Sequence, residues 1–505
     1  MLPTGPPGCS RLTPKYGRAM TAPDTDSPRP TLDLAEYLQD LSDFVMASPS
    51  SYHAAAEVAR RLEAAGYVRV DEAVDFPAEP GGYVLVRDGA VMAWRIPDAG
   101  HIPATPVFRI LGAHTDSPTF KLKPKPSTSR EGWLQAGVEV YGGPLLNSWL
   151  DRELCFAGRM VTVDGREHLV RTGPIARFPQ LAIHLDREVN SGLKLDRQQH
   201  LNPVWGAVPV GDAGGRTADL PTDILAVLAG TAGLDADEVA GFDVVMADTQ
   251  APGVFGASGE LFASGRLDNL SSVHAGLVAM ESLSTSNALP RSLSVDSGWV
   301  PDGNTHPKSS ENTGGVVADG VAGESAGAPV IPVLAAFDHE ELGSASRSGA
   351  AGPVLEDVLR RVLDALGVSG QGTARSFAGS WLLSADAGHL VHPNYAERHD
   401  PVNHPRANGG PLLKINANQR YSTDAAGAAA FARWCGVAGV PFQEFVSNNG
   451  VPCGSTIGPI SATRLGIRTV DVGIGLLSMH SAREMCGTED PARLAAAVTA
   501  FYEGV

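Results

Sequence analysis

Cysteine is scarce in this 505-residue sequence, and no two cysteines are spaced as a pair. The five are odd in number and scattered: Cys9, Cys155, Cys435, Cys453 and Cys486. Because C-x-x-C spacing is absent, the pattern predicts neither a disulfide framework nor a thiolate zinc site. A reducing, cytoplasmic location is the expectation.

Long apolar runs and an excess of positive charge are missing as well. No apolar stretch reaches the roughly 18 residues that a membrane helix needs, and the N-terminal residues lack the order of a signal peptide. The 39 basic residues against 56 acidic ones give a net charge of -17, which argues against binding to nucleic acid or to an anionic membrane. What remains, 43% hydrophobic and 19% charged residues, is typical of a soluble globular protein of two domains or more.

Two segments are too polar to build a core. Residues 1–30 are rich in Pro, Gly, Ser and Thr and predict a disordered tail. Met20 is a candidate start within this tail, and Met1 is the alternative. Residues 284–328 are predicted to be a disordered insertion, because so long a stretch without apolar periodicity is either functional or unstructured. The sequence indicates no role for them.

The rest of the chain alternates between two patterns. Helical periodicity covers residues 34–45, 51–65, 267–283 and 352–366, while strands are predicted at 82–86, 91–96, 107–113, 242–246 and 330–337. Short strands between turns dominate the middle third, at 137–141, 154–163, 168–170 and 182–184. An α/β domain interrupted by a β-rich insert is therefore predicted.

An acidic pair, Glu340-Glu341, follows the apolar run 330–337 directly. Ligands of open α/β sheets sit outside the carboxyl ends of the strands, so one glutamate could bind a metal while the other holds a water. An acidic helix N-terminus is the alternative, since carboxylates there favour the helix dipole. The pair alone does not separate the two.

Other imidazoles and carboxylates also lie at junctions that follow apolar segments: His114, Asp116, Asp268, Asp386 and His480. Each has a structural alternative, such as helix capping for Asp268. Together they form a nitrogen and oxygen donor set that suits catalytic zinc, with manganese or cobalt as substitutes. A two-metal site would also need a bridging carboxylate and a general base.

Ten strings resemble the M18 family of metallo-aminopeptidases, in particular the bacterial type of the aspartyl aminopeptidase group. They run in family order from about residue 34 to the C-terminus. They are GAHTDSP (112–118), VEVYGGPLLNSWLDREL (138–154), LAIHLDR (181–187), ADTQ (247–250), SGRLDNL (264–270), FDHEELGS (337–344), SADAGHLVHPNY (384–395), KINANQRY (414–421), PCGSTIGPI (452–460) and MHSAREM (479–485).

The resemblance implies a division of labour among the residues of the site. Asp268 would bridge two zinc ions, one completed by His114 and Asp386, the other by Glu341 and His480. Glu340 would be the general base, and Asp116 the carboxylate that orients His114. The expected activity is removal of N-terminal residues from peptides with a free N-terminus.

The resemblance also implies residues for substrate recognition. Lys414, Arg420 and Tyr421 would bind an acidic N-terminal residue, Asp or Glu; the alternative for Lys414 is a solvated surface lysine. His389 and His392 are predicted to line the pocket, with a structural role as the alternative. His184 is expected to reach a neighbouring subunit's site and to stabilise the oxyanion there, rather than to bind zinc.

The expected architecture is a mixed-sheet zinc-peptidase catalytic domain (residues 31–118 and 248–505) with an inserted β-rich dimerisation domain (119–247). Dimers would assemble into tetrahedral dodecamers. Two other functions remain open: a related dizinc deacylase or carboxypeptidase, and a non-catalytic self-assembling binding protein, against which Glu340 argues. The sequence leaves open the exact N-terminal residue preference, the physiological substrate and the native metal.

Overall fold

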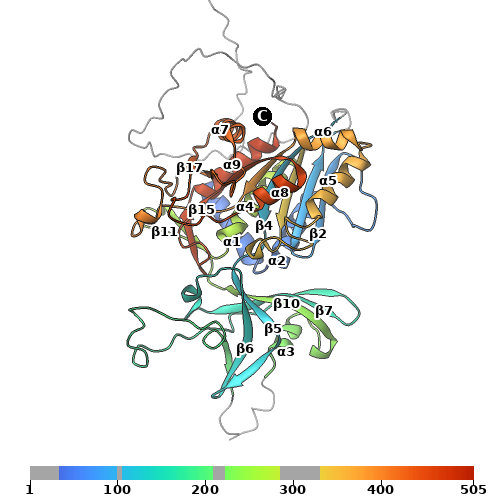
Figure 1. The fold of residues 1–505 in the computed structure, drawn as a ribbon. Helices are drawn as coiled ribbons and strands as arrows, with labels where there is room; N and C mark the ends of the chain where they lie inside the picture. The colour runs from blue at the N-terminus through green and yellow to red at the C-terminus, as the bar shows by residue number, and fades with distance from the viewer. Residues whose placement is uncertain (1–32, 99–104, 209–221, 285–329, 505) are drawn as a thin grey trace, which may run out of the picture.

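The computed structural model describes residues 33–98, 105–208, 222–284 and 330–504. The prediction of disorder for residues 1–30 concerns a part of the chain outside these ranges, and so does that for 284–328 except for Ser284, which is the last residue of α4 (Leu267–Ser284). Figure 1 shows two units, a larger one that carries most helices and a smaller one built mainly of strands.

A nine-stranded mixed sheet forms the centre of the larger unit, in the order β1-β2-β3-β13-β4-β14-β18-β16-β17. β13 is antiparallel to β3 but parallel to β4, and β4 is parallel to β14. The strands are β1 (Val68–Arg69), β2 (Gly81–Arg87), β3 (Ala90–Ile96), β4 (Phe108–His114), β13 (Ile331–Phe337), β14 (Trp381–Ala385), β16 (Leu412–Lys414), β17 (Gln443–Phe445) and β18 (Arg468–Gly473). The central strands β4, β13 and β14 are buried along their whole length, as expected for strands covered on both faces.

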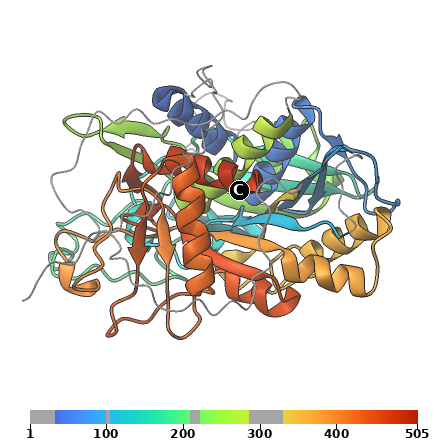
Figure 2. The same cartoon turned by 90° about the horizontal axis from the view of Figure 1, so that it is seen from above.

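Helices cover both faces of this sheet (Figures 1 and 2). One hydrophobic core includes residues of α1 (Leu34–Ala47), α2 (Ser51–Ala64), α4 (Leu267–Ser284), α7 (Ala425–Ala438) and α9 (Asp490–Tyr502). The other includes residues of α5 (Val354–Ala365), α6 (Gln371–Gly379) and α8 (Ile457–Leu465). The predicted helices at 34–45, 51–65, 267–283 and 352–366 are confirmed to within two residues at each end.

The smaller unit is a six-stranded sheet in the order β8-β7-β10-β5-β6-β9, packed with α3 (Ile224–Thr231) around its own core. Its strands are β5 (Thr119–Arg130), β6 (Trp133–Tyr141), β7 (Leu154–Thr162), β8 (Glu167–Arg171), β9 (Val204–Ala207) and β10 (Val239–Asp248). All of them come from one continuous stretch of the chain, so the smaller unit is an insertion between β4 and β11 (Gly253–Phe255) of the larger one.

Two features of the smaller unit differ from the sequence prediction. Residues 182–184 form a turn and no strand, and Ile183 is 49% exposed; their apolar alternation has no strand partner within the described chain. β5 was not predicted, since two prolines interrupt it and proline removes a ladder hydrogen bond. Both prolines fall in the register shift of β5 against β6, between Leu122 and Ser127.

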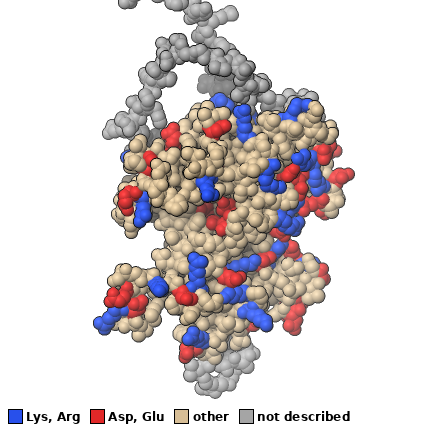
Figure 3. All heavy atoms as spheres, viewed as in Figure 1, with Lys and Arg blue, Asp and Glu red and all other residues tan. Residues whose placement is uncertain are grey.

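Two small sheets of short strands complete the fold, and the charged side chains on the surface are of both signs. β12 (Leu261–Ser264) joins β11 to β20 (Glu484–Gly487), and β15 (Gly388–His389) pairs with β19 (Gly475–Leu476). On the face drawn in Figure 3, Lys and Arg side chains are interspersed with Asp and Glu and form no continuous basic surface. Among the described helices, none combines the length and apolar character needed to cross a membrane.

Candidate metal centre

Three neighbouring parallel strands deliver the site residues to one edge of the large sheet. β4 ends at His114, β13 runs in register beside it with Phe337 opposite His114, and β14 lies on the other side of β4. Glu340 and Glu341 follow β13, and Asp386 follows β14 directly. The carboxyl ends of the strands therefore meet where an α/β sheet places its ligand site.

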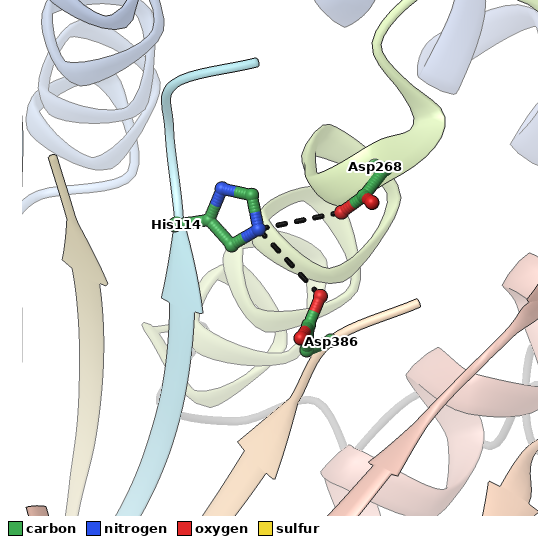
Figure 4. A group of neighbouring side chains, drawn as sticks. All are labelled: His114, Asp268 and Asp386. Carbon is green, nitrogen blue, oxygen red and sulfur yellow. Dashed lines mark ion pairs between the residues drawn. The ribbon is translucent and has the colours of Figure 1, made fainter. Parts of the chain in front are cut away.

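The first group of ligand atoms surrounds the imidazole of His114. Its Nε2 lies 3.3 Å from Oδ1 of Asp268 and 3.6 Å from Oδ1 of Asp386 (Figure 4). His114 and Asp386 come from adjacent strands, whereas Asp268 comes from the start of α4. All three residues are buried.

A second group shares Asp268 with the first. His480 Nε2 lies 3.4 Å from Oδ2 of Asp268 and 3.6 Å from Oε2 of Glu341. Asp268 thus turns one carboxylate oxygen to each histidine. A carboxylate that bridged two metal ions would present one oxygen to each side in this way.

The donor atoms fit metal cations. Oδ1 of Asp268 and Oε1 of Glu341 are buried and accept no hydrogen bond, and burial raises the pKa of Glu341 well above its usual value. Buried carboxylates without a partner are costly, and divalent cations would offset that cost. Histidine nitrogen and carboxylate oxygen without thiolate are the ligands of catalytic zinc.

Glu340 lies beside both groups. Its Oε2 is 4.0 Å from Nε2 of His114. Burial raises the pKa of Glu340 to about 7, with further increases from the negative charges of Asp386, Asp268 and Asp116. A carboxylate with a pKa near neutrality can both accept and return a proton.

The carboxylate of Asp116 holds the backbone of the glutamate pair in place. Oδ1 accepts the N–H of Glu340 at 3.0 Å, and Oδ2 accepts the N–H of Glu341 at 3.2 Å. The same Oδ2 accepts the hydroxyl of Tyr141 at 2.9 Å. Although burial raises it, the pKa of Asp116 is lowered overall by hydrogen bonds and by His114. Nδ1 of His114 lies 3.0 Å from the main-chain oxygen of Asp116 and 3.5 Å from its Oδ1, which leaves Nε2 to face the other ligands.

An open cavity of about 410 Å³ adjoins these groups. Lys414, Tyr421 and His389 line it together with Glu340. Lys414 is 1% exposed and no surface lysine. Its Nζ donates to the main-chain oxygens of Asp386 at 3.0 Å and Ala387 at 2.9 Å.

Of the residues predicted to bind the substrate or its oxyanion, three do not line this cavity within one chain. Arg420 is exposed next to Tyr421, and His392 is half-buried with its N–H donated to Nε2 of His399. His184 lies exposed in a turn of the smaller unit.

Two residues close to the ligands were not singled out from the sequence. The buried carboxylate of Glu484 accepts the backbone N–H of Asp268 at 3.0 Å and that of His480 at 2.7 Å, so it ties two ligand-bearing loops together. Tyr141 reaches Asp116 from the smaller unit. Both lie inside strings shared with the M18 family, which was the available signal.

The site contains two ligand groups that share one aspartate, and it lies at the strand ends of an α/β sheet. Beside it is a glutamate whose pKa is near neutrality. These are the features of a metallohydrolase centre. The family described as "Aminopeptidase I zinc metalloprotease (M18)" matches residues 44–295 and 318–502. The chain belongs to this M18 family and is an aminopeptidase.

Individual relatives agree with this assignment. The "Probable M18 family aminopeptidase 2" of Streptomyces avermitilis is 50% identical over 93% of this chain and 98% of its own length. The structure described as "Cryo-EM structure of the Ape4 and Nbr1 complex" matches with a TM-score of 0.80 and 33% identity, covering 93% of this chain and 86% of that one. The "Structure of S. cerevesiae mApe1 dodecamer" matches with a TM-score of 0.72 and 25% identity, over 92% of this chain and 96% of that one.

Proposed function

We propose that this M18 aminopeptidase works with two zinc ions and removes acidic residues, Asp or Glu, from the N-termini of peptides. The observation that carries the two-ion proposal is the carboxylate of Asp268, whose two oxygens face His114 and His480 separately. His114 and Asp386 would complete one ion, and Glu341 and His480 the other. Manganese or cobalt would suit the same donors.

The residues of the chain divide the reaction between them. Bound zinc supplies Lewis acidity, which lowers the pKa of water and polarises the scissile carbonyl. Glu340 takes the proton from the attacking water and passes it to the leaving amine, a role that its position beside His114 allows. Asp116 keeps Glu340 in place by accepting its backbone N–H. The acidic cluster attracts the ammonium group of the substrate, so a free N-terminus is needed.

Lys414 is the proposed partner of the substrate's side-chain carboxylate. It lines the cavity beside Glu340, and its Nζ lies 4.9 Å from the ring centre of Tyr421. An ammonium group has three donors, two of which already serve main-chain oxygens. The third would be available to a substrate carboxylate, with Tyr421 and His389 lining the same space.

Assembly is part of the proposal. Residues 31–118 and 248–505 would form the catalytic domain and residues 119–247 the dimerisation domain, with dimers building a dodecamer like that described for the yeast relative. Leu181, Ile183 and Leu185, which flank His184, are 49% to 75% exposed, and so apolar a turn suits burial against a second copy. His184 would then act at a neighbour's site. Arg420 and His392 remain proposed substrate-binding residues, although they do not line the cavity of their own chain. We propose a cytoplasmic location.

A substrate panel tests the proposed activity. Aminoacyl-anilides of all N-terminal residues are compared by kcat/KM with N-acyl amino acids and with peptides blocked at the N-terminus. The proposal expects turnover of free-amine substrates, highest for Asp and Glu. Turnover of acylated substrates alone would instead support the deacylase alternative, and no turnover by the zinc-loaded protein would support a binding protein.

A further inference from the structure

One short segment of the smaller unit, Tyr141 to Leu145, contacts the metal centre. Tyr141 is the last residue of β6, and the next four residues lead away from the sheet toward the loop that carries His480. The segment is therefore the continuation of a strand that is fixed in the six-stranded sheet by its pairing with β5 and β9.

Two hydrogen bonds connect this segment to His480. Nδ1 of His480 lies 3.1 Å from the main-chain oxygen of Gly143. A carbonyl oxygen only accepts, so Nδ1 carries the hydrogen and Nε2 keeps its lone pair toward Asp268 and Glu341. The main-chain oxygen of His480 in turn accepts the N–H of Leu145 at 2.9 Å.

A third hydrogen bond reaches the opposite side of the centre. The hydroxyl of Tyr141 donates to Oδ2 of Asp116 at 2.9 Å, the oxygen that also accepts the N–H of Glu341. Tyr141 is half-buried, and burial and the charge of Asp116 raise the pKa of its phenol, which therefore stays a donor at neutral pH.

We propose that Tyr141, Gly143 and Leu145 are positioning residues through which the inserted unit sets the metal affinity and the geometry of the catalytic centre. Gly143 and Leu145 hold His480 on one side of the centre. Tyr141 holds Asp116, which supports the glutamate pair, on the other side. This inference rests on the proposed metal ligands, but it assigns to the insert a role within each subunit that is separate from assembly.

The main-chain bond from Leu145 offers a matched pair of variants. The backbone of Leu145 has φ -70°, which proline adopts without strain, so Leu145→Pro removes the N–H and leaves the fold of the segment possible. Leu145→Ala removes most of the side chain, which is 44% exposed, and keeps the N–H. Zinc dissociation constants are measured on the metal-stripped full-length variants by competition with a chromogenic chelator.

We expect Leu145→Pro to weaken one of two zinc sites by about 10- to 100-fold, the usual effect of losing support behind a metal ligand. Leu145→Ala should stay within about twofold of the wild type. Equal zinc affinities for the two variants would overturn the inference. A wild-type chain that binds fewer than two zinc ions would instead overturn the proposed dizinc function, so the two failures are distinguishable.

Tyr141→Phe tests the hydrogen bond from Tyr141 to Asp116. It remains a test of the proposal if Leu145→Pro loses its cooperative unfolding transition. The variant deletes only the hydroxyl. We expect several-fold weaker zinc binding and about a tenfold lower kcat with little change in KM. The control is Tyr83→Phe, which removes a hydroxyl bonded to the main-chain oxygen of Glu79, away from the site. Tyr141→Phe with wild-type zinc affinity and kcat would refute the role of Tyr141.

Discussion

The ammonium group of Lys414 donates to the main-chain oxygen of Asp386 at 3.0 Å and lies 3.6 Å from Oδ2 of the same residue. The side chain proposed to recognise the substrate's charge thus also holds a proposed metal ligand. Lysine is almost never fully buried without a partner, and Asp386 with Ala387 supplies partners here. If both proposed roles hold, specificity and metal binding would be coupled through this one side chain.

Replacement of Lys414 separates these two roles. Lys414→Met keeps the length of the side chain and removes its charge. We expect kcat/KM for Asp and Glu substrates to fall about tenfold or more relative to neutral substrates, with a smaller loss common to all. Arg360→Ala, which removes an exposed positive charge on α5 outside this cavity, is the control and should leave the preference unchanged. An equal loss on every substrate would reduce Lys414 to a support for Asp386.

Glu340→Gln should separate proton transfer from metal binding. The amide cannot accept the proton of the water, so we expect kcat to fall by about 10²- to 10⁴-fold while zinc content, measured by atomic absorption, stays near that of the wild type. Glu341→Gln is the comparison, and it should lose zinc together with activity. A Glu340→Gln enzyme with full turnover would exclude this residue as the base.

Metal content follows from the shared aspartate. Exhaustive dialysis against a chelator should abolish activity, and zinc, manganese or cobalt should restore it. Asp268→Asn should reduce the bound zinc by more than Asp386→Asn does, because both ligand groups contain Asp268 and only one contains Asp386. Loss of a single ion in both variants would argue against a bridging role.

Acid should destabilise the fold through His53. Burial lowers the pKa of this imidazole to about 4 from a usual 6.5, with help from the positive charges of Arg171 and Arg266. Between pH 6.5 and 4, His53 binds a proton in the unfolded chain but stays neutral in the folded chain. Its contribution to the free energy of unfolding is therefore complete above pH 6.5 and is lost as the pH falls toward 4.

Urea unfolding at several pH values measures this effect. The slope due to His53 is at most about 1.4 kcal/mol per pH unit. His53→Gln should flatten the wild-type curve between pH 6.5 and 4, whereas unchanged curvature would assign the acid sensitivity to other groups, such as the buried His274, whose pKa is also lowered.

The sequence predicted where the ligand residues lie on the sheet better than it predicted which of them contact one another. The run 331–337 is apolar throughout, and only a strand buried on both faces accommodates it, so the place of the glutamate pair followed. That Asp268 meets both His114 and His480 depends on contacts between segments far apart in the chain. The periodicity of a local segment cannot predict such contacts, and only the strings shared with the M18 family indicated them.

Neighbouring residues show a second limit. Arg420 and Tyr421 are adjacent in one string, yet Tyr421 is buried in the cavity wall and Arg420 is exposed. Side chains of consecutive residues in a turn diverge, so a shared motif does not imply a shared pocket. The burial of Lys414 was likewise hidden, because composition marks lysine as a surface residue.

The centre draws on both ends of the chain, and this has a consequence for synthesis. His114 lies in the first third of the 505 residues, while His480 and Glu484 lie close to the end. The second ligand group therefore cannot form until the ribosome has synthesised the chain as far as His480. Since domains fold as they emerge, the smaller unit, whose last strand β10 ends at Asp248, can fold before the metal centre is complete, and we expect no peptidase activity from a nascent chain that ends before His480.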